Sequence, residues 1–321
     1  MKISTEVQLG AALLSNSVSV RVHRCMGAVA GLCEIAVPAS VDVSAAPGDD
    51  LVADLGPADQ AGTVFTGTVD AVEARGAYTV FRALDSRVDA ARTRVNEIFS
   101  DTTTDSVMSD LADAAGLTVG DLAKGVNVVT YLADDGRSVL GHLVHLAELG
   151  GCHLYVDVDG ALQALAYTPA APAWQIEYGG ALIAVTAAAR RGGGPVEVRT
   201  EGAASTNGPD AAYWPTTDTS AVAGVMQAGD LPGIKLWRPE LRSMADATLL
   251  AASTSLRRLQ RSRRVDLRCL GLAEIELGDG VMVQDVPGAD ASLLLRTVAV
   301  EHRANAWEGF ITELGLEGVG T

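Results

Sequence analysis

The chain has 321 residues, of which 48% are hydrophobic and 20% are charged. It is long enough for two or three domains with a sizeable core, and too apolar to be wholly disordered. No apolar run reaches the ~18–20 residues of a membrane-spanning helix, and the N-terminus lacks the charged start and apolar stretch of a signal peptide. A formal charge of −16 disfavours non-specific binding to nucleic acid. We therefore expect a globular protein that assembles in the cytoplasm and has no specific nucleic-acid partner.

Residues 1–95 have the pattern of a β-domain. Alternation with a period of two predicts strands at residues 18–23, 33–37, 51–55, 63–73 and 78–84. Pro47–Asp50 is a turn cluster between two of them, and Gly67 marks a bulge or bend in the longest. Short strands joined by Gly, Pro and Asp turns are typical of an antiparallel barrel or sandwich.

Residues 96–168 predict a small α+β domain. A helix is expected at 105–116, where acidic and hydroxyl residues crowd the start and Gly116 stands at the end. A second helix is expected from Ser138 to Leu149, with its apolar residues on one face. A hairpin follows at 153–165, turning at Asp159-Gly160.

The remaining chain predicts a connector and a second β-domain. Residues 169–235 are expected to hold connecting strands, a flexible tip at 190–195 and an exposed loop at 201–219, because Gly, Pro, Ser and Thr are frequent there. Within residues 236–321, a helix is expected over 246–264, and its last turns are rich in arginine, which suits the helix dipole. The final fifty residues return to strands.

Two distant segments share a pattern that indicates an internal duplication. Gly48-Asp49, Thr68-Val69 and Glu73-Ala74-Arg75 are matched by Gly278-Asp279, Thr297-Val298 and Glu301-His302-Arg303. The separation from Asp to Val is 20 residues in the first segment (49 to 69) and 19 in the second (279 to 298). Chance is the alternative, since such turns are common. A true duplication means two similar β-domains, so that a trimer presents six of them around one axis.

Four stretches, taken in order, resemble a known family. They are Pro47–Asp49 leading to Phe65–Val69, Thr93–Asn96 and the following helix to Leu117, Leu140–Leu162, and Leu277–Asp279 through His302 to Leu314. These stretches span most of residues 18–316. They resemble the baseplate hub proteins of contractile phage tails and related injection systems, the late control D family. The N-terminal hub part of the valine-glycine-repeat (VgrG) spike proteins of type VI secretion is in the same group.

The resemblance implies a fold that is mainly β, with two similar tail-tube-like antiparallel β-domains flanking a small helix–hairpin domain. It implies a homotrimeric baseplate hub, a symmetry adaptor between a sixfold inner tube and a threefold spike, that turns over no substrate. The partners would be further copies of the chain, the inner tube protein, a spike and other baseplate components. The sequence ends at Thr321 without a spike β-helix, so we expect the tip to be a separate polypeptide.

The main concentration of metal-ligand types is His142, His145, Glu148, Cys152 and His153. On a helix the first three share a face because they are three residues apart, and zinc requires three or four converging ligands. The metalloprotease spacing H-E-x-x-H is not present. Partly exposed helix histidines are the simpler interpretation, and we expect no metal and no cofactor.

Other candidate sites also have simpler interpretations. Asp157 and Asp159 form a potential carboxylate pair or Ca²⁺ site, but the full Ca²⁺-loop pattern is absent and a hairpin turn is favoured. Gly192–Gly194 lacks the lysine of a phosphate-binding loop, and no Gly-x-Ser-x-Gly elbow occurs. An arginine cluster is expected to pair with acidic residues across a subunit contact rather than to bind phosphate or RNA. Its members are Arg257, Arg258, Arg261, Arg263 and Arg264.

The four cysteines, Cys25, Cys33, Cys152 and Cys269, have no paired spacing and are expected to be buried free thiols. No catalytic set is predicted. Two alternatives to a hub remain at this stage. One is a cell-wall hydrolase of the same particle that uses His142, Glu148 or Asp159. The other is a non-catalytic soluble module that assembles through exposed edge strands.

Overall fold

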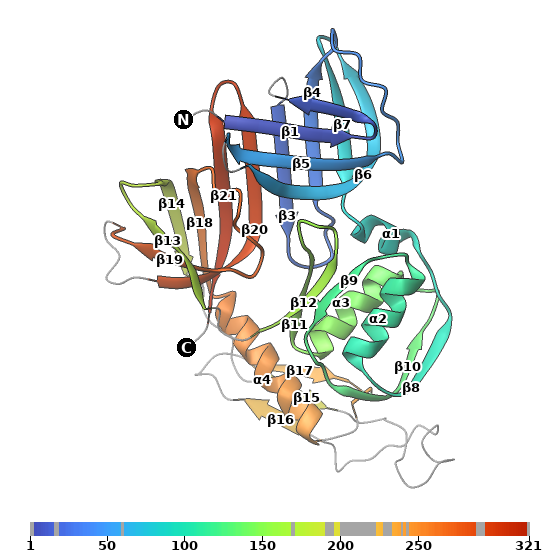
Figure 1. The fold of residues 1–321 in the computed structure, drawn as a ribbon. Coiled ribbons are helices and arrows are strands. Elements are labelled where there is room, and N and C mark those ends of the chain that lie inside the picture. The colour runs from blue at the N-terminus through green and yellow to red at the C-terminus, as the bar shows by residue number, and fades with distance from the viewer. Residues whose placement is uncertain are drawn as a thin grey trace.

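The computed structural model describes residues 3–15, 19–58, 61–167, 171–189, 196–199, 223–226, 233–238, 240–241, 244–286 and 293–319. Two β-domains lie side by side at one end of the molecule, and an α+β domain lies below them (Figure 1). The expected flexible tip at 190–195 and the loop at 201–219 fall outside the described residues. Among the described helices, none is long and apolar enough to cross a membrane.

The first β-domain is a sandwich whose strands follow the expected alternation. Its strands are β1 (Ile3–Leu9), β2 (Ala12–Ser15), β3 (Ser19–Cys25), β4 (Leu32–Pro38), β5 (Asp50–Pro57), β6 (Gly62–Arg75) and β7 (Tyr78–Leu84). They hydrogen-bond in the order β3-β4-β7-β6-β5-β1-β2. In Figure 1, β1 and β5 cross over β3, β4 and β7, and the long strand β6 belongs to both layers. Alternate residues of every layer point into one core that includes Val22, Ile35, Leu51 and Phe81.

Gly67 does not form the bulge that the sequence predicts. It pairs with Leu51, and the two irregular steps of β6 lie on either side of it, between Thr63 and Phe65 and between Val69 and Ala71. A Cβ at position 67 would lie 2.4 Å from the carbonyl oxygen of Leu84. Glycine is therefore required here because another backbone passes close by.

The second β-domain has β13 (Pro172–Glu177), β14 (Leu182–Ala189), β18 (Arg263–Leu270), β19 (Gly280–Gln284), β20 (Leu293–Asn305) and β21 (Gly309–Gly318). Their hydrogen-bonded order is β14-β18-β21-β20-β19-β13. The two orders match strand for strand: β14 corresponds to β3, β18 to β4, β21 to β7, β20 to β6, β19 to β5 and β13 to β1. The two β-domains therefore share one topology, as the duplication predicts. One difference is that β1 is antiparallel to β5 whereas β13 is parallel to β19.

The two Gly-Asp turns make the same hydrogen bonds. Asp49 Oδ2 accepts from Ala46 N at 2.8 Å, and Asp279 Oδ2 accepts from Glu276 N at 2.9 Å. Both preceding glycines have a left-handed backbone, with φ of 101° at Gly48 and 98° at Gly278. The turns are thus the same local structure, built twice.

The backbone also corrects the sequence alignment of the two copies. Gly48 N donates to Val69 O, and Asp49 O accepts from Val69 N, each at 2.8 Å. In the second domain, Thr297 makes both corresponding bonds, with Gly278 N and Asp279 O. Val69 therefore matches Thr297 and not Val298, one residue away from the expected match. A β-bulge follows each of these residues.

The α+β domain contains the expected helices and hairpin. Its elements are α1 (Arg87–Arg92), β8 (Glu97–Thr103), α2 (Thr104–Ala114), β9 (Val119–Leu122), β10 (Asn127–Ala133), α3 (Val139–Leu149), β11 (Cys152–Val156) and β12 (Leu162–Ala166). Ser138 caps α3 by accepting from Gly141 N at 3.2 Å. The apolar faces of α2 and α3 pack on the strands through Leu111, Leu143 and Leu146. The domain limits at residues 95, 168 and 235 stay a prediction.

A further helix, α4 (Met244–Gln260), packs on a small sheet of β15 (Val196–Arg199), β16 (Ala223–Met226) and β17 (Ile234–Trp237). The expected helix over 246–264 is too long at its end. Arg263 and Arg264 belong to β18, because Val265, Leu267 and Cys269 alternate into the core of the second β-domain. The predicted arginine cluster is therefore divided between a helix and a strand.

Candidate assembly surface

The two β-domains are joined into one continuous sheet. Strand β20 of the second domain pairs antiparallel with β3 of the first, from Ala299 opposite Cys25 to Ala304 opposite Val20. Only the last part of β20 makes this joint, because its first part pairs with β19. The sheet therefore passes from one domain to the next by strand pairing, without a linker.

The joint is closed on its core side by buried polar groups. Arg24 is almost fully buried, and its Nη1 lies 3.0 Å from Glu276 Oε2. His302 is fully buried, with its Nδ1 3.0 Å from Thr312 Oγ1. Burial first, and then the nearby Arg24 charge, lower the pKa of His302 to about 3. The imidazole is therefore neutral at physiological pH and belongs to the packing of the joint.

The outward face of the sheet carries a chain of ion pairs that crosses the joint. In order from β18 to β6 the chain runs Arg268, Glu313, Arg303, Glu301, Arg21, Glu34, Arg82, Glu73 and Arg75, with each member paired to the next at 2.6 to 3.8 Å. Burial of Glu301 acts to raise its pKa, but hydrogen bonds from Arg21 and Arg303 outweigh burial and lower it. An open hollow of about 370 Å³ lies on this face over β14, β18, β20, β21 and β3. The face is charged and concave, and its charges neutralise one another.

Among the free strand edges of the described residues, two correspond to the halves of the internal joint. The end of β6, Ala71–Arg75, pairs with β7 on one side and has no described strand on the other. It corresponds to the end of β20, where β3 occupies that second side. Strand β14 pairs with β18 on one side only and corresponds to β3. These two edges lie on opposite sides of the molecule (Figure 1). They are the counterparts of the two halves of the internal joint.

The sequence of β14 is unusual for a free edge. Its residues, LIAVTAAA, carry no charge, whereas soluble proteins protect edge strands with charges, prolines or bulges. On β6, Val72 is 38% exposed and Ala74 is exposed, although their counterparts Val300 and His302 are buried by the internal joint. Both edges therefore expose apolar side chains beside unpaired backbone N–H and C=O groups, which a further strand can pair with.

The structure does not bring the candidate metal ligands together. His142 is buried, with Nδ1 2.9 Å from Tyr131 Oη and Nε2 3.0 Å from the carbonyl oxygen of Asp134. His145 instead faces Glu240, at 3.2 Å. Glu148 is exposed, and no group of three or more His, Cys, Asp or Glu residues that could hold a metal exists in the described part of the chain. His142 and His145 are on one helix, as predicted, but their rings make hydrogen bonds to different groups: Tyr131 and Asp134 for His142, and Glu240 for His145.

His153 lies apart from these two histidines, against Tyr167 with ring centroids 4.6 Å apart. Burial, followed by the charges of Arg257, Arg296 and Arg261, lowers its pKa to about 2. A small cavity of about 60 Å³ lies beside it, between α3, β11 and α4. Cys152 and Glu148 line the same cavity, but the low pKa of His153 reflects its burial first and the neighbouring arginine charges second.

The carboxylate pair is a turn, as expected. Asp157 Oδ1 accepts from Asp159 N at 3.0 Å and from Ala161 N at 2.9 Å, which fixes the β11–β12 hairpin. In the arginine cluster, Arg257 pairs with Glu317 and Arg264 with Asp266, both within the chain. All four cysteines are free, and Cys25 is half-buried whereas the other three are buried. The Gly192–Gly194 segment lies outside the described residues.

The buried ion pair that fixes the α+β domain to the first β-domain was not predicted from the sequence. Arg87 is fully buried and lies 2.6 Å from Asp85 Oδ2, and its Nη1 also donates to the carbonyl oxygens of Cys25 and Gly27. Asp85 Oδ2 accepts from Gly31 N at 2.6 Å as well. The only sequence signal was two opposite charges close together after an apolar strand, which usually indicates a surface pair.

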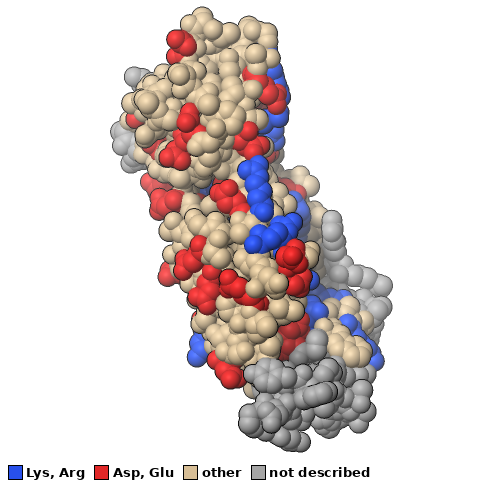
Figure 2. Space-filling model, turned by 90° about the vertical axis from the view of Figure 1, so that its right-hand side faces the viewer, with Lys and Arg blue, Asp and Glu red and all other residues tan. Residues whose placement is uncertain are grey.

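The charge on the face shown in Figure 2 is mixed rather than basic. On the face shown in Figure 2, acidic side chains spread over the β-domain at the top and the α+β domain below, with basic side chains between them. Continuous basic surface, which phosphate binding requires, is not visible on this face. This distribution agrees with the acidic composition.

No family model and no curated protein matches the sequence. Solved structures match nearly the whole chain. A 43 kDa tail protein of prophage MuSo2 from Shewanella oneidensis has a TM-score of 0.72 at 13% identity, over 98% of each chain. A tail protein from Neisseria meningitidis has a TM-score of 0.74 at 13% identity, over 99% of this chain and 97% of its own.

A component of the E. coli type VI secretion system, described as similar to T4 bacteriophage tail proteins, has a TM-score of 0.63 at 9% identity. That match covers 97% of this chain and 76% of the E. coli chain. Identities this low compare folds and not residues. The arrangement of duplicated β-domains and α+β domain described above is therefore the fold of the phage tail proteins and of this secretion-system component, a hub-like and VgrG-like fold.

Proposed function

We propose that this chain is the structural hub of a contractile tail or injection-system baseplate, and that three copies close into a ring of six similar β-domains. One observation carries the proposal: the joint within the chain, β20 with β3, has both of its halves repeated as free edges, β6 and β14. Strand β14 of one copy then pairs with the end of β6 in the next. The tail-protein fold supports the same role.

The duplication fixes the register of this second joint. Residues that pair with one another across neighbouring strands can be followed from each Gly-Asp turn to the far edge of each domain. In the first domain they are Val69, Ala83, Cys33 and Val22, and in the second they are Thr297, Leu316, Val265 and Ala187. Ala187 of β14 is therefore equivalent to Val22 of β3. In the internal joint, His302 lies opposite Val22. The corresponding residues between copies are Ala74 and Ala187. The same step places Glu73 opposite Ala188 and Arg75 opposite Thr186.

Repeating a heterologous contact builds a ring when the rotation closes, and an open filament when it does not. Because each copy supplies two equivalent β-domains, three copies give six positions around the axis. A sixfold tube ring then meets a matching surface, while the single α+β domain of each copy retains threefold symmetry for a spike. The proposed partners are therefore other copies, the inner tube protein, a separate spike or tip, and other baseplate components.

The test is a disulfide between copies. Ala74→Cys combined with Ala187→Cys should cross-link purified hub into covalent trimers, because residues directly opposite in antiparallel strands have Cβ atoms about 4.5–5.5 Å apart. The readout is mass under denaturing, non-reducing conditions. Dimers and trimers are expected from the double variant, and either single variant should give no ladder above a dimer.

A register control separates the proposed pairing from random collision. Ala184 is on the same strand as Ala187 but three residues away, so its side chain points to the other face. Ala74→Cys with Ala184→Cys should remain uncross-linked under the same oxidation. Equal cross-linking of both double variants, or a monomeric mass for the native hub in its particle, would refute the ring.

The proposed role is structural, without a catalytic site or cofactor. Two of the three hydrolase candidates have structural tasks: His142 packs under Tyr131, and Asp159 lies in a turn. The third, Glu148, is exposed at the mouth of the small cavity, away from both. No observation on the described residues favours a cell-wall hydrolase over a hub.

A further inference from the structure

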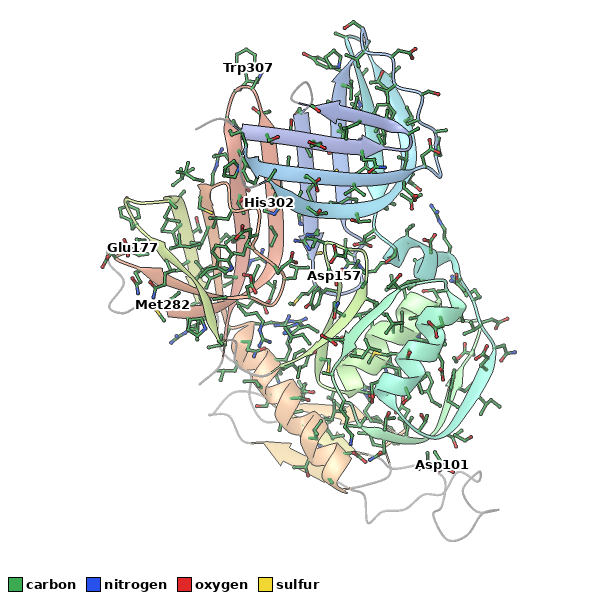
Figure 3. The ribbon with its side chains drawn as sticks, viewed as in Figure 1. Asp101, Asp157, Glu177, Met282, His302 and Trp307 are labelled. Carbon is green, nitrogen blue, oxygen red and sulfur yellow. The ribbon has the colours of Figure 1, made fainter. Side chains whose placement is uncertain are left out.

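A tryptophan stands almost fully in solvent at the tip of the β20–β21 hairpin. Trp307 is 96% exposed, the most exposed of the large apolar side chains described. It projects from the end of the hairpin, away from the α+β domain (Figure 3). Large exposed aromatic residues are costly to leave in water and are enriched at the centres of protein interfaces.

The hairpin that carries Trp307 is longer than its counterpart in the first domain. The β6–β7 hairpin closes at Arg75 opposite Tyr78, which corresponds to Arg303 opposite Ile311. The β20–β21 hairpin continues for two more pairs, Ala304 with Phe310 and Asn305 with Gly309. The extension occurs in only one of the two repeats. In the proposed ring of six β-domains, the longer hairpin is therefore present on every second domain.

The tip is held rigidly. Asn305 Oδ1 accepts from Trp307 N at 2.9 Å and from Glu308 N at 2.8 Å. Glu308 is paired with Arg268 of β18 at 2.7 Å. Below the tip, Phe310 is buried in the core of the first β-domain. The backbone that carries the indole is therefore held by hydrogen bonds, which reduces the entropy cost of ordering the tip on binding.

Among the described residues, one end of the sheet is left uncovered. The other end is covered by the α+β domain, where Gly27 N donates to Leu154 O at 2.7 Å and Ser86 Oγ donates to Gly160 O at 3.2 Å. A second ring that stacks on the sheet can approach only from the end that carries Trp307. Tyr78, 52% exposed, lies at the corresponding tip of the first domain.

We propose that Trp307 is the anchor by which each hub subunit binds the first ring of the inner tube, inserting its indole into an apolar pocket of a tube subunit. The assignment rests on the proposed hub function. Three of the six tube subunits would be bound in this way, and the other three would meet the shorter tip at Tyr78. The sixfold tube ring is then anchored at three sites related by the threefold axis of the hub.

The experiment uses tails assembled in the producing cell from the complete gene cluster that encodes this chain. With Trp307→Ala, the hub should remain folded and trimeric, because the removed side chain makes no core contact. Loss of an aromatic anchor weakens binding by about 30-fold at each site. Tails that carry a tube, counted by electron microscopy, should therefore fall at least about tenfold. Trp237→Ala, which removes a 58% exposed tryptophan on β17, is the matched control and should leave the count unchanged.

A second measurement identifies the occupant. The photo-reactive residue p-benzoylphenylalanine at position 307 should cross-link to the tube subunit, identified by mass spectrometry of the adduct. A link to the spike, the sheath or another hub copy, no link at all, or a wild-type tail count with Trp307→Ala would each overturn the anchor. The Ala74–Ala187 disulfide is independent of Trp307, so an intact trimer with normal tubes refutes the anchor alone, and a missing trimer refutes the hub.

Discussion

At the residue scale, two arginines on one short helix have very different environments. Arg87 is fully buried against Asp85, and Arg92 is about two-thirds exposed beside Asp70. A buried charge that loses its partner keeps its desolvation cost, whereas an exposed pair is worth little. The position of the side chain decides the energy, although both are salt bridges within 2.8 Å.

We expect Arg87→Ala to lower the free energy of unfolding by about 3–5 kcal/mol, because Asp85 stays buried without its cation. Arg92→Ala should cost no more than about 1 kcal/mol. Urea unfolding of the isolated hub measures both. Equal losses in the two variants would mean that the Asp85–Arg87 pair does not fix the α+β domain to the β-domain.

At the element scale, the duplicated Gly-Asp turns offer an internal comparison. A Cβ at Gly48 meets nothing within 4 Å, but a Cβ at Gly278 would lie 2.7 Å from Leu165 Cδ2. The two turns have the same backbone and hydrogen bonds, and differ in whether the α+β domain packs on them. The duplication therefore preserved the turn and changed its surroundings.

Gly48→Ala should destabilise the protein by about 1–3 kcal/mol, the range for a side chain held in left-handed backbone. Gly278→Ala should cost more, since Leu165 must also move. The control is Gly62→Ala in β6, where the backbone is extended and a Cβ has open space, with an expected change within about 0.5 kcal/mol. Denaturant midpoints decide the order, and a Gly48 variant as stable as the control would contradict the role of the turn.

At the scale of the whole molecule, the two joints of the proposed ring differ in charge. Within the chain, Arg21 Nε reaches Glu301 Oε1 at 2.8 Å across the joint. Between copies, Glu73 takes the place of Glu301, but Thr186 takes the place of Arg21. The joint between copies thus lacks one ion pair that the internal joint has, and separate chains can assemble and dissociate more readily.

Restoring that charge should strengthen the trimer. Thr186→Arg recreates the internal arrangement, in which Arg21 faces Arg303 directly and reaches Glu301 diagonally, and the added pair with Glu73 contributes about 0.2–1 kcal/mol per joint. The concentration at which trimers dissociate, measured by mass photometry, should fall several-fold at low salt, and the gain should shrink at high salt. Thr186→Arg combined with Glu73→Gln should lose the gain, because the new cation then has only Arg75 opposite it. An equal gain in both variants would exclude the proposed register.

Local signals in the sequence were enough for much of the fold. Alternation predicted β4, β5 and β7, the position of Gly116 predicted the end of one helix, one apolar face predicted the helix from Ser138 to Leu149, and two Gly-Asp turns predicted the duplication. Strands β1, β2, β8, β9 and β10 were missed. The end of α4 was placed too late, because arginines suit both a helix end and the outward face of a strand. Helix spacing placed His142 and His145 on one face, but Tyr131 and Glu240, which bind them, come from elsewhere in the chain.

The sequence by itself determined the composition of the two β-domains, their turns and their repeated order, since these depend on neighbours along the chain. Only the tertiary structure decided which edges are used and which remain free. Pairing of β20 with β3 brings together residues about 280 positions apart, and no local pattern contains that contact. The one-residue correction between the two repeats has the same origin, because β-bulges set the register only once two strands are aligned.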